Sequence, residues 1–183
     1  GATVVTAAAP LIIAHRGASA YLPEHTLAAK ALAHGMGADF IEQDVVLTRD
    51  GVPIVLHDIH LDSTTDVANR FPARHRDDGH YYAIDFTLAE VKTLRAVERY
   101  GADGAPVFPG RFPAGPGLFE VPTLAEEIAL IEGLNRSRGV SAGLYIEMKN
   151  SALHRAEGQD LPAAVLRVLE EAGWADRADR VFL

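Results

Sequence analysis

Residues 40–58, FIEQDVVLTRDGVPIVLHD, contain the feature that decides the fold. Two apolar, β-branched runs flank Asp50-Gly51, a dipeptide typical of the two-residue turn of a β-hairpin. A link this short excludes a parallel pairing, which needs a crossover of a dozen or more residues. With this dipeptide as the turn, the register places Asp44 opposite His57.

Two carboxylates lie on one face of the first strand of this hairpin, because side chains alternate along a strand and Glu42 and Asp44 are two residues apart. The register adds His57 to the same surface, which indicates a site. The alternative is that both acids belong to the solvated face of an edge hairpin, the commoner outcome for an isolated Glu-x-Asp triplet. Companions elsewhere in the chain favour the site.

The composition is typical of a globular domain with a substantial core, since 48% of the 183 residues are hydrophobic. No run approaches the ~18 consecutive apolar residues of a membrane span, so we expect no stable membrane insertion. The net charge of −8, with scattered Lys and Arg, argues against a nucleic-acid partner. The absence of cysteine excludes disulfides and thiolate metal sites. Gly1–Pro10 lacks the features of a signal peptide, so we interpret it as a mature or tagged N-terminus.

The segment before the hairpin predicts a strand, a helix and a second strand. Pro10–Gly17 is expected to be a buried strand that runs into a polar turn, and Pro23–Thr26 to open a helix that continues to about His34. Strand, helix and strand with short links form a βαβ unit with two parallel neighbours. His15 then lies at the carboxyl end of its strand, where α/β sheets build their sites.

We expect residues 59–121 to form an insertion on the face of an α/β barrel rather than a separate domain. Gly101–Gly117 contains five Gly and four Pro, so we expect a loop there. The one helix predicted within the insertion starts at the capping box Thr87-Leu88-Ala89-Glu90 and runs to about Arg99. Long loops in such folds surround the site, so we expect the insertion to shape its mouth.

Four further elements follow the insertion: a helix over 123–135, a strand over 143–149, a helix over 161–173 and a strand that starts at 180. The first helix opens with a second capping box, Thr123-Leu124-Ala125-Glu126. In the strand, Tyr145, Glu147 and Lys149 share a face.

The order of elements predicts an α/β fold, a TIM (β/α)8 barrel. About four of the eight barrel strands are present, whereas a whole barrel typically needs ~250 residues. An apolar half-strand at residues 180–183 would leave an open sheet edge, which native proteins avoid. We therefore expect residues 1–183 to be the N-terminal part of a single barrel domain, with an insertion after the second strand and its hairpin.

Five motifs resemble the signature of the glycerophosphodiester phosphodiesterase family, in the family's order and over the chain from Leu11 onward. They are His15-Arg16-Gly17-Ala18-Ser19, Pro23-Glu24-His25-Thr26-Leu27, Ile41-Glu42-Gln43-Asp44, His57-Asp58 and Glu147-Met148-Lys149. The insertion, through residues 81–88 and 109–113, is similar to the periplasmic branch of the family. The sequence departs from the family at His25, where many members carry Asn, and at Asn150-Ser151.

The resemblance implies a divalent metal held by Glu42, Asp44 and Glu147. Three carboxylates without a thiol or an obvious imidazole triad independently favour a hard cation, Ca²⁺ or alternatively Mg²⁺. For Glu147 the alternative is an ion pair with a neighbouring Lys or Arg.

The resemblance also implies that His15 and His57 form the acid–base pair, and an imidazole with a pKa near ~6.5 can take and give a proton under working conditions. The alternative for each is a structural histidine. The other histidines are expected to be surface or loop residues: His25, His34, His60, His75, His80 and His154.

Arg16, Lys149 and Glu24 are the expected substrate or phosphate-binding residues. The site would carry no net charge, because the divalent metal and the cations Arg16 and Lys149 balance the three carboxylates and the phosphodiester monoanion. Glu24 either orients Arg16 or favours the N-terminus of the following helix through its dipole.

The activity implied is that of a phosphoric diester hydrolase, which cleaves glycerophosphodiesters to an alcohol and sn-glycerol 3-phosphate. We favour His15 as base and His57 as acid, with either water or a substrate hydroxyl as nucleophile. By resemblance the expected location is periplasmic or secreted, the partner is the small-molecule substrate, and a homodimer is compatible with the sequence.

Three other functions remain open. A lipid-directed phosphodiesterase of the same fold, acting on a lysolipid or sphingomyelin, would use the apolar loop Phe108–Phe119. A non-catalytic binding or surface domain would not need the intact acids and histidines. A sugar-phosphate isomerase barrel is disfavoured because the sequence has no Gly-rich phosphate loop.

Overall fold

The structure is a computed structural model, and it describes residues 10–112 and 117–183. The elements in chain order are β1 Ile13–Ala14, α1 Leu27–Gly35, β2 Phe40–Leu47, β3 Pro53–Val55, α2 Val67–Arg70, η1 Ala83–Asp85, α3 Leu88–Lys92, α4 Leu124–Arg138, β4 Gly143–Met148, α5 Ser151–Ala156, α6 Leu161–Glu171 and β5 Val181–Phe182. The short elements α2, η1 and α5 were not predicted from the sequence.

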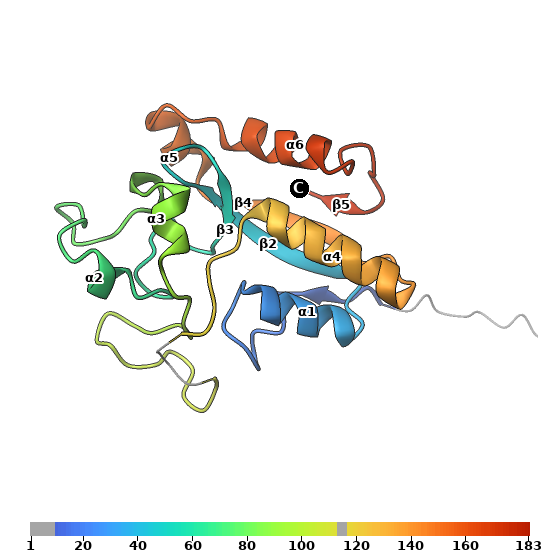
Figure 1. Cartoon of the computed structure of the whole chain (residues 1–183), viewed down its shortest axis with the longest axis horizontal. Coiled ribbons are helices and arrows are strands. Elements are labelled where there is room, and N and C mark those ends of the chain that lie inside the picture. The colour runs from blue at the N-terminus through green and yellow to red at the C-terminus, as the bar shows by residue number, and fades with distance from the viewer. Residues whose placement is uncertain (1–9, 113–116) are drawn as a thin grey trace, which may run out of the picture.

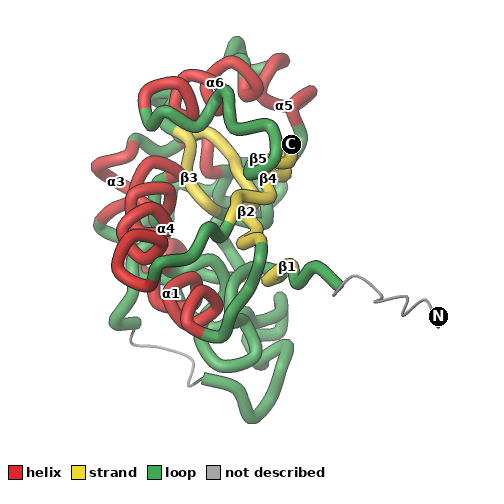
Figure 2. Tube along the Cα trace, turned by 90° about the vertical axis from the view of Figure 1, so that its right-hand side faces the viewer, coloured by secondary structure: helices red, strands yellow, loops and turns green. Residues whose placement is uncertain are grey.

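One sheet organises the described residues, in the strand order β1-β2-β4-β5. All neighbours along this path are parallel, and β3 pairs with β2 in the antiparallel direction. Helices α1, α4 and α6 lie on one side of the sheet, while α2 and α3 lie beyond the β3 hairpin (Figures 1 and 2). The structure therefore has the predicted α/β architecture with a parallel sheet.

Helix boundaries follow from their caps. The Thr26 hydroxyl accepts a hydrogen bond from the amide of Ala29 and starts α1. The predicted capping box at Thr123 is present at the start of α4. This helix runs to Arg138, three residues beyond the predicted end, and stops at Gly139, which has a left-handed φ of 65°.

Helix α3 confirms its predicted capping box at Thr87 but is shorter than predicted. It ends at Lys92 instead of about Arg99 because the following backbone bonds to other parts of the insertion. The amide of Ala96 donates to the carbonyl of Phe119 at 2.8 Å, and the amide of Val97 donates to Thr64 at 2.8 Å. These contacts replace the bonds that a longer helix would have made.

The predicted hairpin register is wrong by one residue. Val45 pairs with Val55 and Leu47 with Pro53, so Asp44 lies opposite Leu56 rather than His57. The turn has three residues, 49–51, with Gly51 at a φ of 78°, because the Thr48 hydroxyl accepts from the amide of Val52. His57 belongs to the loop after β3, which carries it back to the site.

The first strand was predicted to be buried, and this was wrong. Leu11, Ile12 and Ile13 are 67%, 56% and 44% exposed. Strand β1 is only two residues long and lies at the edge of the sheet. Within the described residues, β1 has one neighbouring strand, β2, and its other edge has none. An edge strand without a second neighbour stays exposed.

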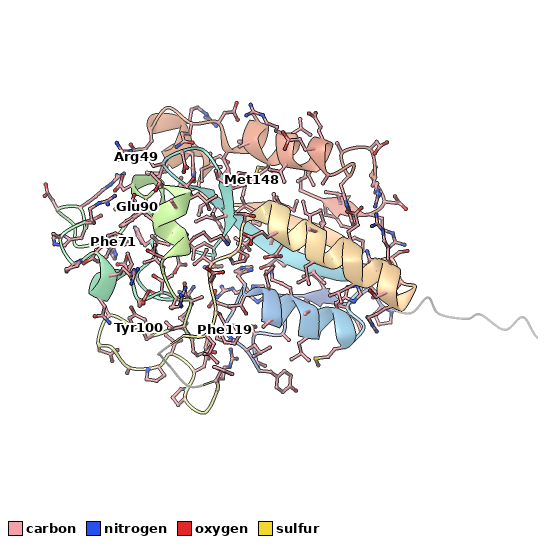
Figure 3. All side chains as sticks on the ribbon, viewed as in Figure 1. Arg49, Phe71, Glu90, Tyr100, Phe119 and Met148 are labelled. Carbon is pink, nitrogen blue, oxygen red and sulfur yellow. The ribbon has the colours of Figure 1, made fainter. Side chains whose placement is uncertain are left out.

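Two apolar clusters hold the molecule together. The first lies between the sheet and helices α4 and α6, with Ile41, Leu144 and Leu124 at its centre. The second joins β2 and β3 to the insertion and contains Val46 and Ile54 together with residues such as Leu61, Phe86 and Leu94. Phe71 and Phe119 of the insertion, labelled in Figure 3, pack against this second cluster. The insertion is thus anchored on the hairpin that carries the predicted site. Among the described residues, no helix combines the length and apolarity needed to cross a bilayer.

Candidate active site

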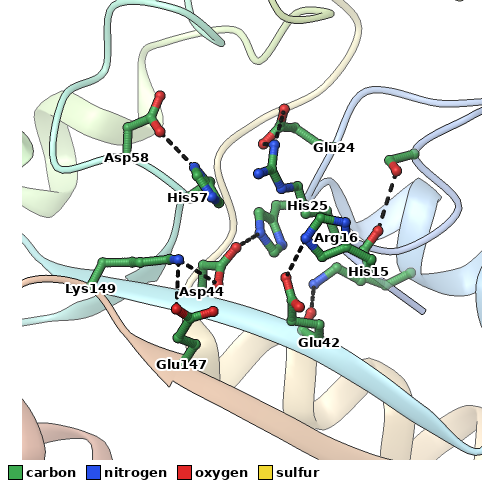
Figure 4. A network of polar contacts seen from close by, with 12 residues as sticks. His15, Arg16, Glu24, His25, Glu42, Asp44, His57, Asp58, Glu147 and Lys149 are labelled. Atoms are coloured by element: carbon green, nitrogen blue, oxygen red, sulfur yellow. Dashed lines mark hydrogen bonds and ion pairs between the residues drawn. The ribbon is translucent and has the colours of Figure 1, made fainter. Parts of the chain in front are cut away.

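The predicted site residues come together at one end of the sheet, on the face opposite the main helices (Figure 4). The loop between β1 and α1 supplies His15, Arg16, Glu24 and His25. Strand β2 supplies Glu42 and Asp44, the loop after β3 supplies His57 and Asp58, and the end of β4 supplies Glu147 and Lys149.

The loop between β1 and α1 has an unusual backbone. Arg16 and His25 have φ values of 59° and 60°, in the left-handed region that non-glycine residues rarely adopt. The amide of His25 donates to the carbonyl of Arg16 at 3.0 Å and ties the two positions together. Gly17 also has a positive φ, and a Cβ there would meet the backbone of Ala29 at 3.0 Å. Such strain is typical of functional loops, where the surrounding structure maintains it.

Glu42 and Asp44 form a buried acidic pair on β2, with residue exposures of 6% and 0%. Glu42 Oε1 and Asp44 Oδ1 have no hydrogen-bond partner within the part of the chain that the structure describes. Burial, and then the charge of Asp44, raise the pKa of Glu42 to about 7. A buried pair of carboxylates with free oxygens is a site that a cation would stabilise.

His25 is the residue that the sequence analysis misplaced. It lies in a loop, as predicted, but it is buried rather than at the surface, and its Nε2 lies 2.7 Å from Asp44 Oδ2. Burial lowers the pKa of His25 to about 3, so the neutral imidazole donates its Nε2 proton to the ionised Asp44. Burial alone would raise the pKa of Asp44, but this hydrogen bond, with the nearby cations, holds it well below its usual range.

These donors fit the divalent metal that the family resemblance implies. Possible ligand atoms of His25, Glu42 and Asp44 lie within 4.8 Å of one another, and because His25 Nε2 donates to Asp44, the two carboxylates are the acidic ligands of this group. The free carboxylate oxygens are the hard ligands that Ca²⁺ and Mg²⁺ prefer. We therefore regard this cluster as a candidate metal centre.

Glu147 is close to this cluster but is not part of it in the structure. It pairs with Asp44 in the β2–β4 ladder, so both side chains lie on one face of the sheet. Its side chain is 53% exposed, and its Oε1 lies 2.8 Å from Lys149 Nζ. The ion pair considered from the sequence is therefore present, and a role of Glu147 in metal binding stays a prediction.

The two candidate catalytic histidines lie on either side of the acidic pair (Figure 4). His15 Nε2 is 3.8 Å from Glu42 Oε1, and the side chain of His15 is 70% exposed. His57 Nδ1 is 2.6 Å from Asp58 Oδ1. Burial alone would raise the pKa of Asp58, but hydrogen bonds from His57 and Arg99 hold it well below its usual range. Asp58 is therefore the acceptor, and His57 carries a proton on Nδ1.

Three charged residues surround these groups. Arg16 Nη1 lies 3.3 Å from both oxygens of Glu24, whereas Arg16 Nε is buried without a partner among the described residues. This contact supports the orienting role predicted for Glu24, which precedes the N-cap Thr26 by two residues. Lys149 Nζ is 3.6 Å from Asp44 Oδ1 in addition to its contact with Glu147.

Two further histidines predicted to be surface or loop residues are buried. His34 lies in α1, where its Nε2 is 2.7 Å from Asn135 Oδ1 of α4. His154 accepts a hydrogen bond from the amide of Leu47 at 3.0 Å and so fixes the end of β2. Both join elements distant in sequence, which no local pattern signals. His75 and His80 are exposed, as predicted, and His60 is partly buried.

Residues 15–183 match the glycerophosphoryl diester phosphodiesterase family, and the chain belongs to that family. It is 47% identical over 176 residues to a glycerophosphodiester phosphodiesterase of Haemophilus influenzae, covering 94% of this chain and 48% of that protein. It is 43% identical to the Treponema pallidum enzyme, with coverages of 94% and 49%. The chain spans about half the length of these relatives.

Solved structures of the family share its fold. A glycerophosphodiester phosphodiesterase from Agrobacterium tumefaciens is similar with a TM-score of 0.62 and 28% identity, over 93% of this chain and 55% of that one. A phosphodiesterase from Oleispira antarctica, in complex with the product sn-glycerol-3-phosphate, gives a TM-score of 0.60 and 30% identity, with coverages of 89% and 53%. The predicted family and the predicted α/β fold of TIM-barrel type are confirmed.

Proposed function

We propose that this chain belongs to an enzyme that hydrolyses glycerophosphodiesters to an alcohol and sn-glycerol 3-phosphate. One observation carries the proposal. Two imidazoles, a buried acidic pair and two cations, from four segments distant in sequence, converge on one surface of a chain of this family (Figure 4). The product complex of the Oleispira antarctica relative supports the same substrate class.

The histidines are suited to the two proton transfers. The Nδ1 proton of His57 bonds to Asp58, so Nε2 is left to exchange a proton at the reacting end of the ring. His15 is exposed beside Glu42, where a nucleophile could reach its ring. We assign His15 as the base, and His57, protonated on both ring nitrogens, as the acid that gives its Nε2 proton to the leaving alcohol.

Arg16 and Lys149 would bind the phosphodiester. Arg16 brings a guanidinium that is 19% exposed and oriented by Glu24, and this group can pair with a phosphate oxygen. Lys149 projects from the end of β4 toward Asp44 and Glu147 and brings a positive charge to the same surface (Figure 4). Together these residues would hold the anion between the two imidazoles.

We assign the metal as Ca²⁺, with Mg²⁺ as the alternative, because the free donors are carboxylate oxygens. Glu42 and Asp44 would hold it, with Glu147 as a third carboxylate. When bound, the ion supplies a positive charge that polarises the phosphoryl oxygens. We also propose a periplasmic or secreted location, supported by the similarity of the insertion to the periplasmic branch.

The test is release of sn-glycerol 3-phosphate from glycerophosphocholine by the full-length protein, with Ca²⁺ and with a chelator. The proposal predicts activity that the chelator removes and that His15→Ala lowers by at least about a hundredfold, the usual scale of acid–base catalysis. The matched control is His75→Ala, which changes an exposed histidine of the insertion. Activity that survives both chelation and His15→Ala would contradict the proposal.

A second candidate, a lipid-directed phosphodiesterase, is favoured by exposed apolar residues near the site. Tyr21 is 62% exposed in the same loop as His15, and Phe108 is 40% exposed beneath Arg111. Arg111 Nη1 donates to the carbonyl of Ser19 in that loop, so these residues lie on the same side of the molecule. Hydrolysis of lysophosphatidylcholine in vesicles faster than glycerophosphocholine would support this candidate over the first.

A further inference from the structure

Arg99 belongs to the insertion but contacts the site. It follows α3 in a segment whose backbone is fixed by hydrogen bonds within the insertion. The amide of Tyr100 donates to Ser63 at 3.0 Å, and the carbonyl of Arg99 accepts from Val107 at 3.0 Å. Its side chain is only 15% exposed. The backbone that carries this guanidinium is therefore fixed within the insertion.

The guanidinium joins two acids of the site that are distant in sequence. Its Nε and Nη2 donate to the two oxygens of Glu24 at 2.7 and 3.1 Å. Its Nη1 donates to Asp58 Oδ2 at 2.8 Å. A planar fork can make these three bonds at once, which a lysine ammonium cannot do in this geometry.

Each acid that Arg99 holds contacts a residue with a proposed role in the reaction. The second oxygen of Asp58 accepts the Nδ1 proton of His57 at 2.6 Å. Glu24 contacts Arg16 at 3.3 Å. The order of contacts is thus His57, Asp58, Arg99, Glu24 and Arg16, and Arg99 is the central link.

We propose that Arg99 is a positioning residue, through which the insertion fixes the tautomer and orientation of His57 by way of Asp58, and the placement of Arg16 by way of Glu24. The catalytic meaning of this inference rests on the proposed function. When an oriented carboxylate holds the Nδ1 proton, the neutral imidazole stays in one tautomer, in which Nε2 carries no proton. Without the guanidinium, Asp58 can rotate, and His57 loses its fixed partner.

The alternative is that Arg99 only fastens the insertion to the barrel. Both roles predict a loss of stability when Arg99 is replaced, so stability cannot separate them. The state of the His57 ring separates them, because fastening alone would leave the Nδ1 proton in place.

The experiment uses full-length protein labelled with ¹⁵N-histidine and compares wild type with Arg99→Gln, Arg99→Lys and Arg95→Gln. Arg95→Gln is the matched control, since Arg95 is a 47%-exposed arginine of the same segment, 3.9 Å from Glu120. Imidazole ¹⁵N shifts report which ring nitrogen of His57 carries the proton. We expect the Nδ1–H form in wild type and in the control, and a tautomer mixture in both Arg99 variants.

Kinetics with glycerophosphocholine provide the second readout. We expect Arg99→Gln to lower kcat by about 10–100-fold, the usual effect of losing a residue that orients a functional group. Arg99→Lys keeps the positive charge but loses the planar set of N–H donors. We therefore expect it to recover less than half of the decrease in log kcat seen in Arg99→Gln. Arg95→Gln should keep the wild-type kcat.

Two results would overturn the inference: an unchanged Nδ1–H tautomer of His57 in a folded Arg99 variant, or wild-type kcat in Arg99→Gln. If Arg99→Gln does not fold, the tautomer in Arg99→Lys decides. A wild-type protein without phosphodiesterase activity would refute the proposed function instead, and the tautomer comparison would still judge the link from Arg99 to His57.

Discussion

Glu42 should make the stability of the metal-free protein fall as the pH rises toward neutrality. Its pKa in the folded state is about 7, against an ordinary value of 4.5, because of burial and the charge of Asp44. The folded state therefore binds this proton more tightly than the unfolded chain. The stabilisation is complete below the unfolded pKa and is lost as the pH rises through the folded one.

The shift corresponds to at most roughly 3 kcal/mol of unfolding free energy, lost between about pH 4.5 and about pH 7.5. Glu42→Gln has no titrating carboxyl, so its stability should lack this fall. Asp44 does not obscure the comparison. Its pKa is lowered on folding, so its contribution is present above its ordinary value of 3.8 and is lost only at lower pH.

The assay is urea denaturation of the full-length wild type and Glu42→Gln at a series of pH values, with a chelator and then with millimolar Ca²⁺. The difference between the two free energies of unfolding should change by up to roughly 3 kcal/mol over this range with the chelator. Ca²⁺ should reduce the change, because a cation favours the ionised carboxyl. Parallel pH curves for the two proteins in the chelator would refute the reasoning.

Three further predictions concern buried polar groups. Lys30→Met should cost about 3–5 kcal/mol in urea denaturation, because it leaves Glu127 buried and unpaired, and adding Glu127→Leu should recover most of this loss. Thr123→Ala should cost about 1 kcal/mol by removing an N-cap, whereas Thr123→Ser should cost little; equal losses would argue against capping. His25→Ala should weaken Ca²⁺ binding by about 10–100-fold in calorimetry, because Asp44 loses the donor that orients it, and an unchanged affinity would contradict this role.

Local sequence signals predicted the main elements well. The capping boxes at Thr87 and Thr123 start helices in the structure, and residues 40–47 form the expected strand. Alternation along this strand correctly placed Glu42 and Asp44 on one face. These features depend on contacts within a few residues, so a sequence pattern contains them.

Features that depend on contacts between distant segments were missed. The hairpin register is an exception, since it shifted for a local reason: the Thr48 hydroxyl accepts from the amide of Val52, which favours a three-residue turn. His25 is buried because the loop before α1 folds onto Asp44, nineteen residues away in sequence. Arg99 lies 41 residues from Asp58, inside an insertion whose path no local pattern specifies. The resemblance marked position 25 as a departure from the family, and this was the available signal for His25.

The predicted grouping of His57 with Glu42 and Asp44 is present in the structure, although the hairpin register that suggested it is wrong. His57 reaches the site from the loop after β3 and not as the cross-strand neighbour of Asp44. The convergence of the predicted residues therefore depends on how the chain returns to the end of the sheet. That return is stabilised by the apolar cluster between the hairpin and the insertion.

The most direct test of the central claim is a crystal structure of the full-length protein grown with Mn²⁺, which replaces Ca²⁺ or Mg²⁺ and is located by its anomalous scattering. We expect one strong peak within coordination distance of the carboxylates of Glu42 and Asp44, with the rings of His15 and His57 on either side. A peak at another place, or none beside Glu42 and Asp44 at a saturating metal concentration, would contradict a metal-dependent site built from these residues.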